Sequence, residues 1–227
     1  MTILTLNDDL QLKDILNEER KLDSLRGQKS NFIVLKDPET GTILGYRKNL
    51  VVRTGREYNL RKIFGIPYNG ETITQLNNRT INLFSIGKGG SAASDPFSPL
   101  PVTATDQNMN TEVAFRAIST SQNLGADAPK YTDMRTLNGV NYYYKKTFTS
   151  KSIVLDDTNN DYYVKVGLDI TDLDARGEVI SELGLYTSEV NSGVYSNFRM
   201  ATRVTFPSES MTINTKKGLA IDYYIYS

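Results

Sequence analysis

The sequence predicts a mainly β fold, an antiparallel β-sandwich preceded by an N-terminal α/β segment that contains an amphipathic helix. The main observation is three runs near the C-terminus, residues 179–187, 198–206 and 218–226, in which apolar and polar residues tend to alternate. β-Branched and aromatic residues are frequent in these runs, and turn-forming residues lie between them. We interpret the three runs as an antiparallel meander with one buried face.

The last of these runs has two distinct faces, because side chains alternate along a strand. The face that we expect to be buried carries Leu219, Ile221, Tyr223 and Ile225. The other face carries Tyr224 and Tyr226, which we interpret as candidate interface residues. Tyrosine is enriched at subunit contacts because its ring is large and apolar while its hydroxyl is polar.

The composition excludes several classes of function. The chain has 227 residues with 26 basic and 26 acidic side chains, so its net charge gives no sign of a general phosphate-binding surface. It contains neither cysteine nor histidine, which excludes disulfide scaffolds, thiol nucleophiles, Ser-His-Asp hydrolysis and zinc sites in their usual forms. No apolar run approaches the roughly 20 residues of a membrane-spanning helix, so no membrane partner is expected. We expect no cofactor.

Residues 1–79 are interpreted as an assembly segment made of a helix, a hairpin and a short helix. The first helix is predicted at residues 8–26, between a capping Asn7 or Asp8 and Gly27. Its apolar positions repeat at helical spacing and are candidate interface residues: Leu12, Ile15, Leu16, Leu22 and Leu25. The pattern leaves open whether this helix packs on a neighbouring subunit or on its own sheet.

A hairpin is predicted from residues 32–35 and 42–46, which flank a loop of turn-forming residues. Residues 58–64 predict a short helix that ends before Gly65. The densest basic cluster of the chain lies here and consists of Arg53, Arg56, Arg61 and Lys62. It lacks interleaved aromatic residues, so we expect solvated faces and inter-subunit ion pairs rather than contact with nucleic acid.

The β-sandwich domain is predicted at residues 80–227, with a long loop or projecting insertion near residues 119–138 that is rich in Ser, Asn, Gly and Asp. The strands expected before the meander are residues 80–86, 113–118, 141–150, 152–155 and 162–170. Residues 87–94 are rich in glycine, but Lys88 precedes two glycines rather than Ser or Thr, which is the wrong order for a phosphate-binding loop. Beyond it we predict an extended strap across a neighbour, with interface candidates Pro96, Phe97, Pro99 and Pro101.

Two acidic groups are the candidates for ion binding or catalysis. Asp157, Asn159 and Asp161 have the spacing of calcium-loop ligands, but Tyr162 and Leu168 stand where that loop needs Gly and Glu. We therefore favour an Asx-rich turn there and keep the three residues as weak metal candidates. The second group could supply the paired carboxylates of a glycosidase, and it consists of Asp169, Asp172, Asp174 and Glu178.

Three stretches together resemble structural proteins of tailed-bacteriophage virions, particularly tail, baseplate and fibre-attachment proteins. The first is Ser181-Glu-Leu-Gly-Leu-Tyr186 with residues 200–207 and the closing aromatic strand. The others are residues 49–58 with their helix-like continuation, and residues 83–90 running into 95–101. The resemblance implies a virion protein that is assembled in the host cytoplasm and has other virion proteins as partners.

We therefore expect a non-enzymatic structural component of the tail, baseplate or neck that assembles as a symmetric homo-oligomer. The first alternative is a receptor- or carbohydrate-binding sandwich, in which residues 119–138 and tyrosines such as Tyr142 and Tyr143 form the recognition surface. The second alternative is a carboxylate-based glycosidase, which needs two acidic side chains close together in a cleft.

Overall fold

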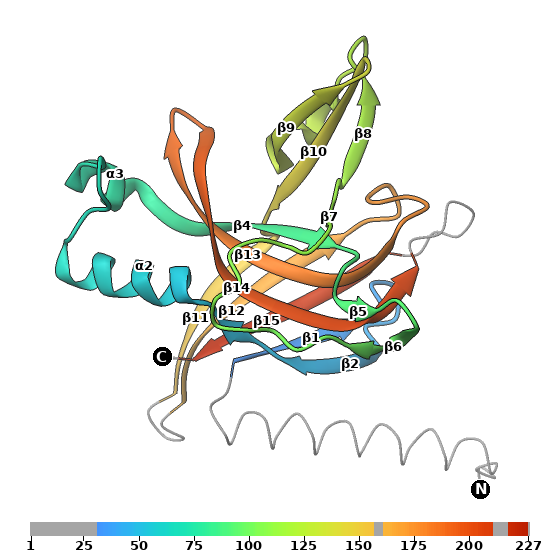
Figure 1. The fold of residues 1–227 in the computed structure, drawn as a ribbon, viewed down its shortest axis with the longest axis horizontal. Helices are drawn as coiled ribbons and strands as arrows, with labels where there is room; N and C mark the ends of the chain where they lie inside the picture. The colour runs from blue at the N-terminus through green and yellow to red at the C-terminus, as the bar shows by residue number, and fades with distance from the viewer. Residues whose placement is uncertain (1–30, 157–160, 211–217, 227) are drawn as a thin grey trace, which may run out of the picture.

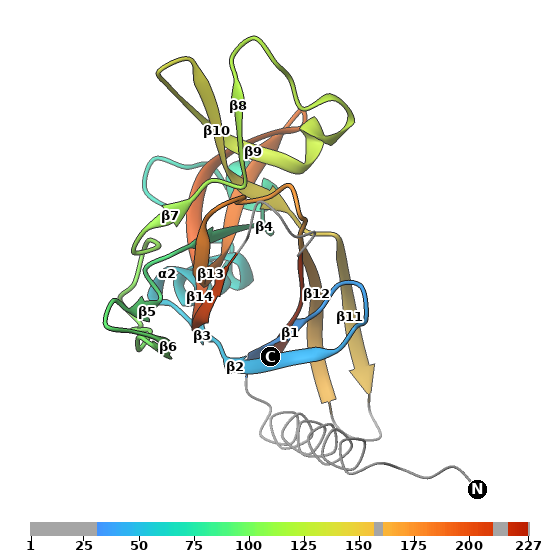
Figure 2. The same ribbon diagram turned by 90° about the vertical axis from the view of Figure 1, so that its right-hand side faces the viewer.

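The computed structural model describes residues 31–156, 161–210 and 218–226, and its fold is mainly β, as the sequence predicts. Two antiparallel sheets lie face to face (Figure 2). The five-stranded sheet has the order β11 (Ser150–Asp156), β12 (Asp161–Ile170), β15 (Leu219–Tyr226), β1 (Phe32–Lys36) and β2 (Ile43–Lys48). The eight-stranded sheet has the path β3 (Leu50–Val51), β14 (Val194–Ser210), β13 (Val179–Asn191), β4 (Arg79–Gly87), β10 (Val140–Thr147) and β8 (Arg116–Ser119).

Two further strands extend the eight-stranded sheet, and a separate small hairpin lies outside it. β7 (Glu112–Val113) pairs with β4, and β9 (Tyr131–Leu137) pairs with β10. β5 (Ser91–Ala92) and β6 (Asp95–Pro99) pair only with each other among the described strands. Figure 1 shows β8, β9 and β10 rising together from the body of the molecule.

The core fills the space between the two sheets. It contains Ile33 of β1 and the predicted apolar face of β15, and from the other sheet Phe84, Leu183, Leu185 and Phe206. The hydroxyls of Thr202 on β14 and Tyr223 on β15 lie 2.5 Å apart, which joins the sheets by a buried hydrogen bond. The predicted alternation of β15 is confirmed, since Leu219, Ile221 and Tyr223 are buried in this core.

The predicted three-stranded meander is wrong at its third strand. β13 and β14 pair as expected, but β15 lies in the other sheet, between β12 and β1. β15 carries apolar or aromatic residues on both faces, which suits a central strand that has a partner on each side.

The division between residues 1–79 and 80–227 is not seen in the strand pairing. β1 pairs with β15 along five residues and with β2 on its other side, so the predicted N-terminal hairpin is part of the sandwich. The predicted helix at residues 8–26, with its candidate residues Leu12, Ile15, Leu16, Leu22 and Leu25, lies outside the described residues.

Residues 119–138 do not form the long loop that composition predicts. They contain a 3-10 helix, Gly125–Lys130, and then β9, which forms a hairpin with β10. The hairpin turns at Asn138 and Gly139, whose φ angles of 50° and 75° are those of a tight two-residue turn. The Asn-Gly pair was the signal for this hairpin, and the surrounding polar residues obscured it.

Two helices sit beside the eight-stranded sheet. α2 (Arg53–Phe64) ends at Gly65, which has the left-handed conformation (φ 63°), as the predicted helix end requires. α3 (Ile73–Asn78) begins at a capping box in which Thr72 and Gln75 bond each other's backbone N–H groups. Among the described helices, none has the length and apolar character needed to cross a bilayer.

Candidate protein-docking surface

The helical lobe, which we define as residues 53–78 with α2 and α3 (Figure 1), carries several exposed apolar side chains. Leu60, Ile63 and Phe64 share one face of α2, because they are three and four residues apart. Ile66 follows the helix end, and Ile73 begins α3. The exposed fractions are 59% for Leu60, 74% for Ile63, 68% for Phe64, 55% for Ile66 and 46% for Ile73. We call these five side chains the lobe patch.

The turn at Gly65 brings the two ends of the lobe patch together. A Cβ atom at Gly65 would lie 3.7 Å from Cδ1 of Ile73, so the first side chain of α3 reaches the C-terminal end of α2. Ile63 and Phe64 directly precede Gly65, so exposed apolar residues of both helices lie near this turn.

α2 is seated directly on the backbone of β14. A Cβ atom at Gly55 would lie 2.1 Å from the carbonyl oxygen of Ala201, so only glycine allows this approach. Val52 N–H donates to the same carbonyl oxygen at 3.1 Å, and the Thr54 hydroxyl donates to the carbonyl oxygen of Met200. These contacts fix the N-terminal end of the helix.

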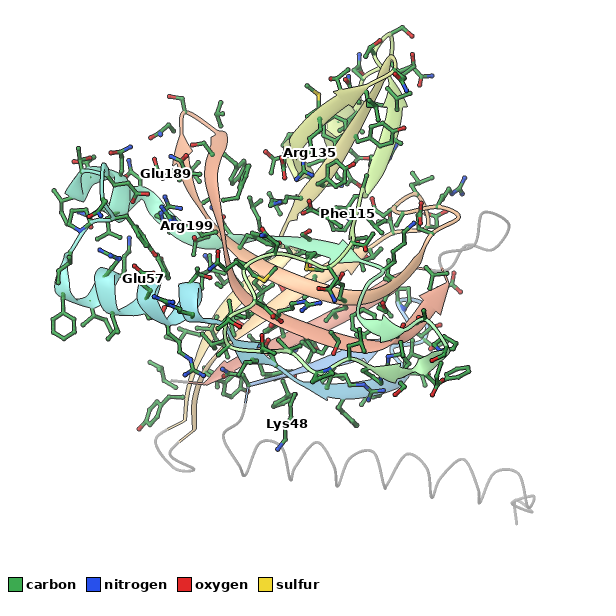
Figure 3. The ribbon with its side chains drawn as sticks, viewed as in Figure 1. Lys48, Glu57, Phe115, Arg135, Glu189 and Arg199 are labelled. Carbon is green, nitrogen blue, oxygen red and sulfur yellow. The ribbon has the colours of Figure 1, made fainter. Side chains whose placement is uncertain are left out.

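A buried ion-pair cluster fixes the rest of the lobe, and we call it the Arg79 clamp. Arg79 is fully buried, and its Nη2 lies 2.7 Å from Oε1 of Glu71 and 2.8 Å from Oε1 of Glu189. Glu71 precedes α3, Arg79 starts β4 and Glu189 belongs to β13, so the cluster joins the lobe to the sheet. Figure 3 shows Glu189 and Arg199 at the base of the lobe.

Tyr68 lies among three guanidinium groups at the centre of this cluster. The guanidinium carbons of Arg199, Arg61 and Arg79 lie 4.0, 4.5 and 5.5 Å from its ring centroid. Burial raises the pKa of Tyr68, although the charge of Arg199 opposes the shift. Cation–π contacts of this kind hold the ring and the arginines in place. The lobe patch is therefore carried by a rigid support, which lowers the entropic cost of binding a partner.

The predicted strap at residues 91–101 is a small exposed hairpin of β5 and β6. Phe97 is 77% exposed, and the interface candidates Pro96, Pro99 and Pro101 are exposed as well. Two hydrogen bonds connect this segment to β14. Thr205 Oγ1 donates to the Leu100 carbonyl oxygen at 2.6 Å, and the hydroxyls of Ser91 and Ser208 lie 2.6 Å apart. The four candidate residues are thus available to a partner.

Tyr224 does not have the position that we predicted for an interface residue. Its exposed fraction is 4%, and its ring stacks on Phe32 with 4.5 Å between centroids. Alternation placed it correctly on the face opposite the core, but that face also carries a buried apolar cluster. The side chain of Tyr226 lies outside the described residues, as do Asp157, Asn159 and the side chain of Asp161.

The glycine-rich loop after β4 is filled by a carboxylate of the protein itself. Oε1 of the buried Glu182 accepts hydrogen bonds from the N–H groups of Gly89 and Thr111, each at 3.1 Å. Oε2 pairs with Arg203, whose Nη1 also lies 2.6 Å from Asp106. The N–H groups of Gly89 and Thr111 therefore already have an acceptor within the protein and are not free to bind an external anion. The local sequence gave no indication that Glu182 would be this acceptor.

Three members of the second acidic group have different ion-pair partners. The buried Asp174 pairs with Lys146 at 2.7 Å and accepts a hydrogen bond from Tyr131 at 2.7 Å. Burial raises the pKa of Tyr131, and its hydrogen bond to Asp174 raises it further. Asp172 pairs instead with Arg176 at 3.8 Å, and Glu178 pairs with Lys88 at 3.0 Å. Each of these three carboxylates is thus matched to a different cation.

Two open pockets flank β8. The pocket of about 470 Å³ is lined by Tyr142, Tyr144, Glu112 and Glu178, among others. The pocket of about 440 Å³ is lined by Asp169 and Asp172 together with basic residues. Tyr143 points the other way, since it packs against the core and forms an edge contact with Tyr131.

Comparisons of the chain with protein-family models, with curated proteins and with solved structures found no match. Function must therefore be inferred from the chemistry and geometry of the surface. The lobe patch is the feature that sequence reasoning missed. The spacing of Leu60, Ile63 and Phe64 predicts an apolar helix face, but the pattern alone cannot say whether such a face meets the core or the solvent.

Proposed function

We propose that the protein is a non-enzymatic structural subunit of a tailed-bacteriophage virion, in the tail, baseplate or neck, which forms a symmetric homo-oligomer and docks other virion proteins. The lobe patch carries this proposal. Five large apolar side chains, each 46–74% exposed, belong to one small helical lobe that buried ion pairs attach to the sheet. Large apolar patches on a protein surface mark interaction sites, because removing apolar surface from water when a partner binds is favourable in free energy.

Two further observations support a structural role over a catalytic one. The chain contains no histidine or cysteine, and the carboxylates of Asp172, Asp174 and Glu178 are each paired with a different cation. The resemblance of residues 181–186, 200–207 and 49–58 to virion structural proteins supplies the setting. The proposed location is accordingly the virion, after assembly in the host cytoplasm.

The test combines intact particles with two variants. We expect mass spectrometry of purified particles to detect the protein, and we expect the double variant Ile63→Ser, Phe64→Ser to be lost from them. The matched control is Val194→Ser, which changes an apolar side chain with 66% exposure at the turn of the β13–β14 hairpin. Absence of the wild-type chain from particles, or equal incorporation of the lobe variant and the control, would contradict the proposal.

Carbohydrate binding is a second candidate, favoured by the pocket beside β8. Tyr142 and Tyr144 line it together with Glu112 and Glu178, and sugar-binding sites combine aromatic rings with carboxylates. If this is the function, the isolated protein binds immobilised glycans and Tyr142→Ala abolishes the binding. The control is Tyr195→Ala, because Tyr195 pairs with Val190 beside the β13–β14 turn and does not line this pocket. No glycan binding by the wild type would remove this candidate.

A further inference from the structure

β11 forms an open edge of the five-stranded sheet. All seven of its residues pair with β12, and no strand among the described residues lies on its other side (Figure 2). The backbone of that side presents N–H and C=O groups that another strand can pair with. Of the residues by which proteins commonly block such an edge, β11 contains Lys151 near its start and no proline.

In the second half of β11, the face that continues the core-facing side of the sheet is apolar. Ile153 and Leu155 are 67% and 66% exposed, and they oppose Val164 and Tyr162 of β12 in the register. Val164 packs against the core between the sheets, so Ile153 and Leu155 continue the buried face of the sheet outward. An apolar edge of this kind is an aggregation hazard unless a partner covers it.

The sequence of β11 is complementary to the β11 strand of a second copy of the chain. Two copies of a strand that are related by a two-fold axis perpendicular to the sheet pair antiparallel and keep each side chain on its own face. With the axis at Val154, Ile153 of each copy opposes Leu155 of the other, so apolar residues meet apolar residues. With the axis at Ile153, the two Ile153 side chains would face each other but Lys151 would oppose Leu155 at two places, so fewer apolar pairs form than with the axis at Val154.

We propose that β11 pairs with β11 of a second copy about a two-fold axis at Val154, which joins the two five-stranded sheets into one continuous sheet. This inference rests on the self-assembly part of the proposed function and names one of its interfaces. The contact is isologous, because the same strand contributes from both copies, and it leaves the lobe patch free for a different protein.

Single cysteine variants test the register directly, since the chain has no cysteine of its own. In Val154→Cys the two cysteines would face each other with Cα atoms about 4.5–5.5 Å apart, within reach of a disulfide. In the control Ser152→Cys, on the same face of the same strand, the two positions would be offset by four residues, or roughly 13 Å. We expect mild oxidation to convert Val154→Cys to a covalent dimer on a non-reducing gel and to leave Ser152→Cys monomeric.

Charge variants test the same interface without a cross-link. The double variant Ile153→Glu, Leu155→Glu places carboxylates opposite carboxylates, so it should shift from dimer to monomer in light scattering. The variant with lysine at both positions should do the same, and an equimolar mixture of the two should restore a dimer because opposite charges then face each other. Val194→Glu is the control, with an exposed fraction of 66% like that of Leu155.

Circular dichroism should show that all these variants fold, because the changed side chains lie on an edge strand. Three results would each overturn β11 pairing: equal cross-linking of both cysteine variants, cross-linking of Ser152→Cys alone, or a monomeric wild-type chain together with a Val154→Cys variant that does not cross-link. The two cross-linking results would leave the proposed function standing if the chain is still found in particles, whereas a monomeric wild-type chain would also contradict its homo-oligomer. Conversely, a β11 dimer that is absent from particles would contradict the virion assignment alone.

Discussion

Nη2 of Arg79 lies 2.8 Å from Oε1 of Glu189, and both side chains are buried. The two residues are 110 positions apart in the chain, and their contact ties the start of β4 to the far part of β13. Because Arg79 also binds Glu71 beside α3, this guanidinium group links the α3 side of the helical lobe to the sheet. A buried charge that loses its partner is costly, so the pair makes the lobe sensitive to one substitution.

Arg79→Ala is expected to reduce the free energy of unfolding by about 3–5 kcal/mol, since the buried Glu189 loses its only charged partner among the described residues and keeps the hydrogen bond from Asn197 Nδ2 at 2.9 Å. Denaturant unfolding followed by circular dichroism measures the change. The control is Lys130→Ala, which removes an exposed ion pair with Asp127 and should leave the free energy of unfolding almost unchanged, because solvent screens that pair. Equal stability of the two variants would show that the Arg79 clamp contributes little.

Gly55→Ala tests the seating of α2 on β14. Alanine usually stabilises a helix by about 1 kcal/mol relative to glycine. Here its methyl group would meet the Ala201 carbonyl oxygen at 2.1 Å, so we expect a net loss of about 1–3 kcal/mol. Thermal unfolding compares it with Gly45→Ala on β2, where the nearest atom of a new Cβ is 3.9 Å away. A Gly55→Ala protein as stable as the wild type would contradict the close approach.

Asp222 gives the five-stranded sheet an acid-sensitive contact. Burial alone would raise the pKa of Asp222, but hydrogen bonds from Lys36 of β1 and Lys165 of β12 hold it below its usual value. The contact therefore stabilises the fold above the unfolded-state pKa of about 3.9 and is lost as the pH falls through the lower folded-state pKa.

The matching variant is Asp222→Asn. Its free energy of unfolding should lie below that of the wild type at pH 7, and the difference should shrink as the pH falls below about 4. Urea unfolding at a series of pH values measures it, and Asp95→Asn on the exposed strand β6 is the control. A difference that stays constant with pH would mean that the charge of Asp222 does not contribute.

Local patterns predicted those parts of the fold that depend on neighbouring residues. The alternation in β15 predicted its core face, and Gly65 predicted the end of α2. The β1–β2 hairpin followed from the turn residues between its strands. In each case the physical cause lies within a few residues, so the sequence displays it.

Strand pairings and ion pairs between segments that are far apart in the sequence could not be predicted in the same way. Nothing local to β15 says that it leaves β14 for β12 and β1, because its side-chain pattern suits either sheet. The buried charges are similar, since Arg79 and Glu182 stand in strand patterns where a charged residue normally faces solvent. Their partners come from distant segments, and only the assembled fold shows them.

The central place of β15 has a consequence for how the chain is made. β1 and β2 leave the ribosome early, and β11 and β12 follow much later, yet these two halves of the sheet are joined only by residues 219–226. Ribosomes add about 5–20 residues per second, so the nascent chain carries two unjoined half-sheets for several seconds. During translation the half-sheets therefore expose edges that β15 later covers, and this is the interval in which a chaperone would have most to bind.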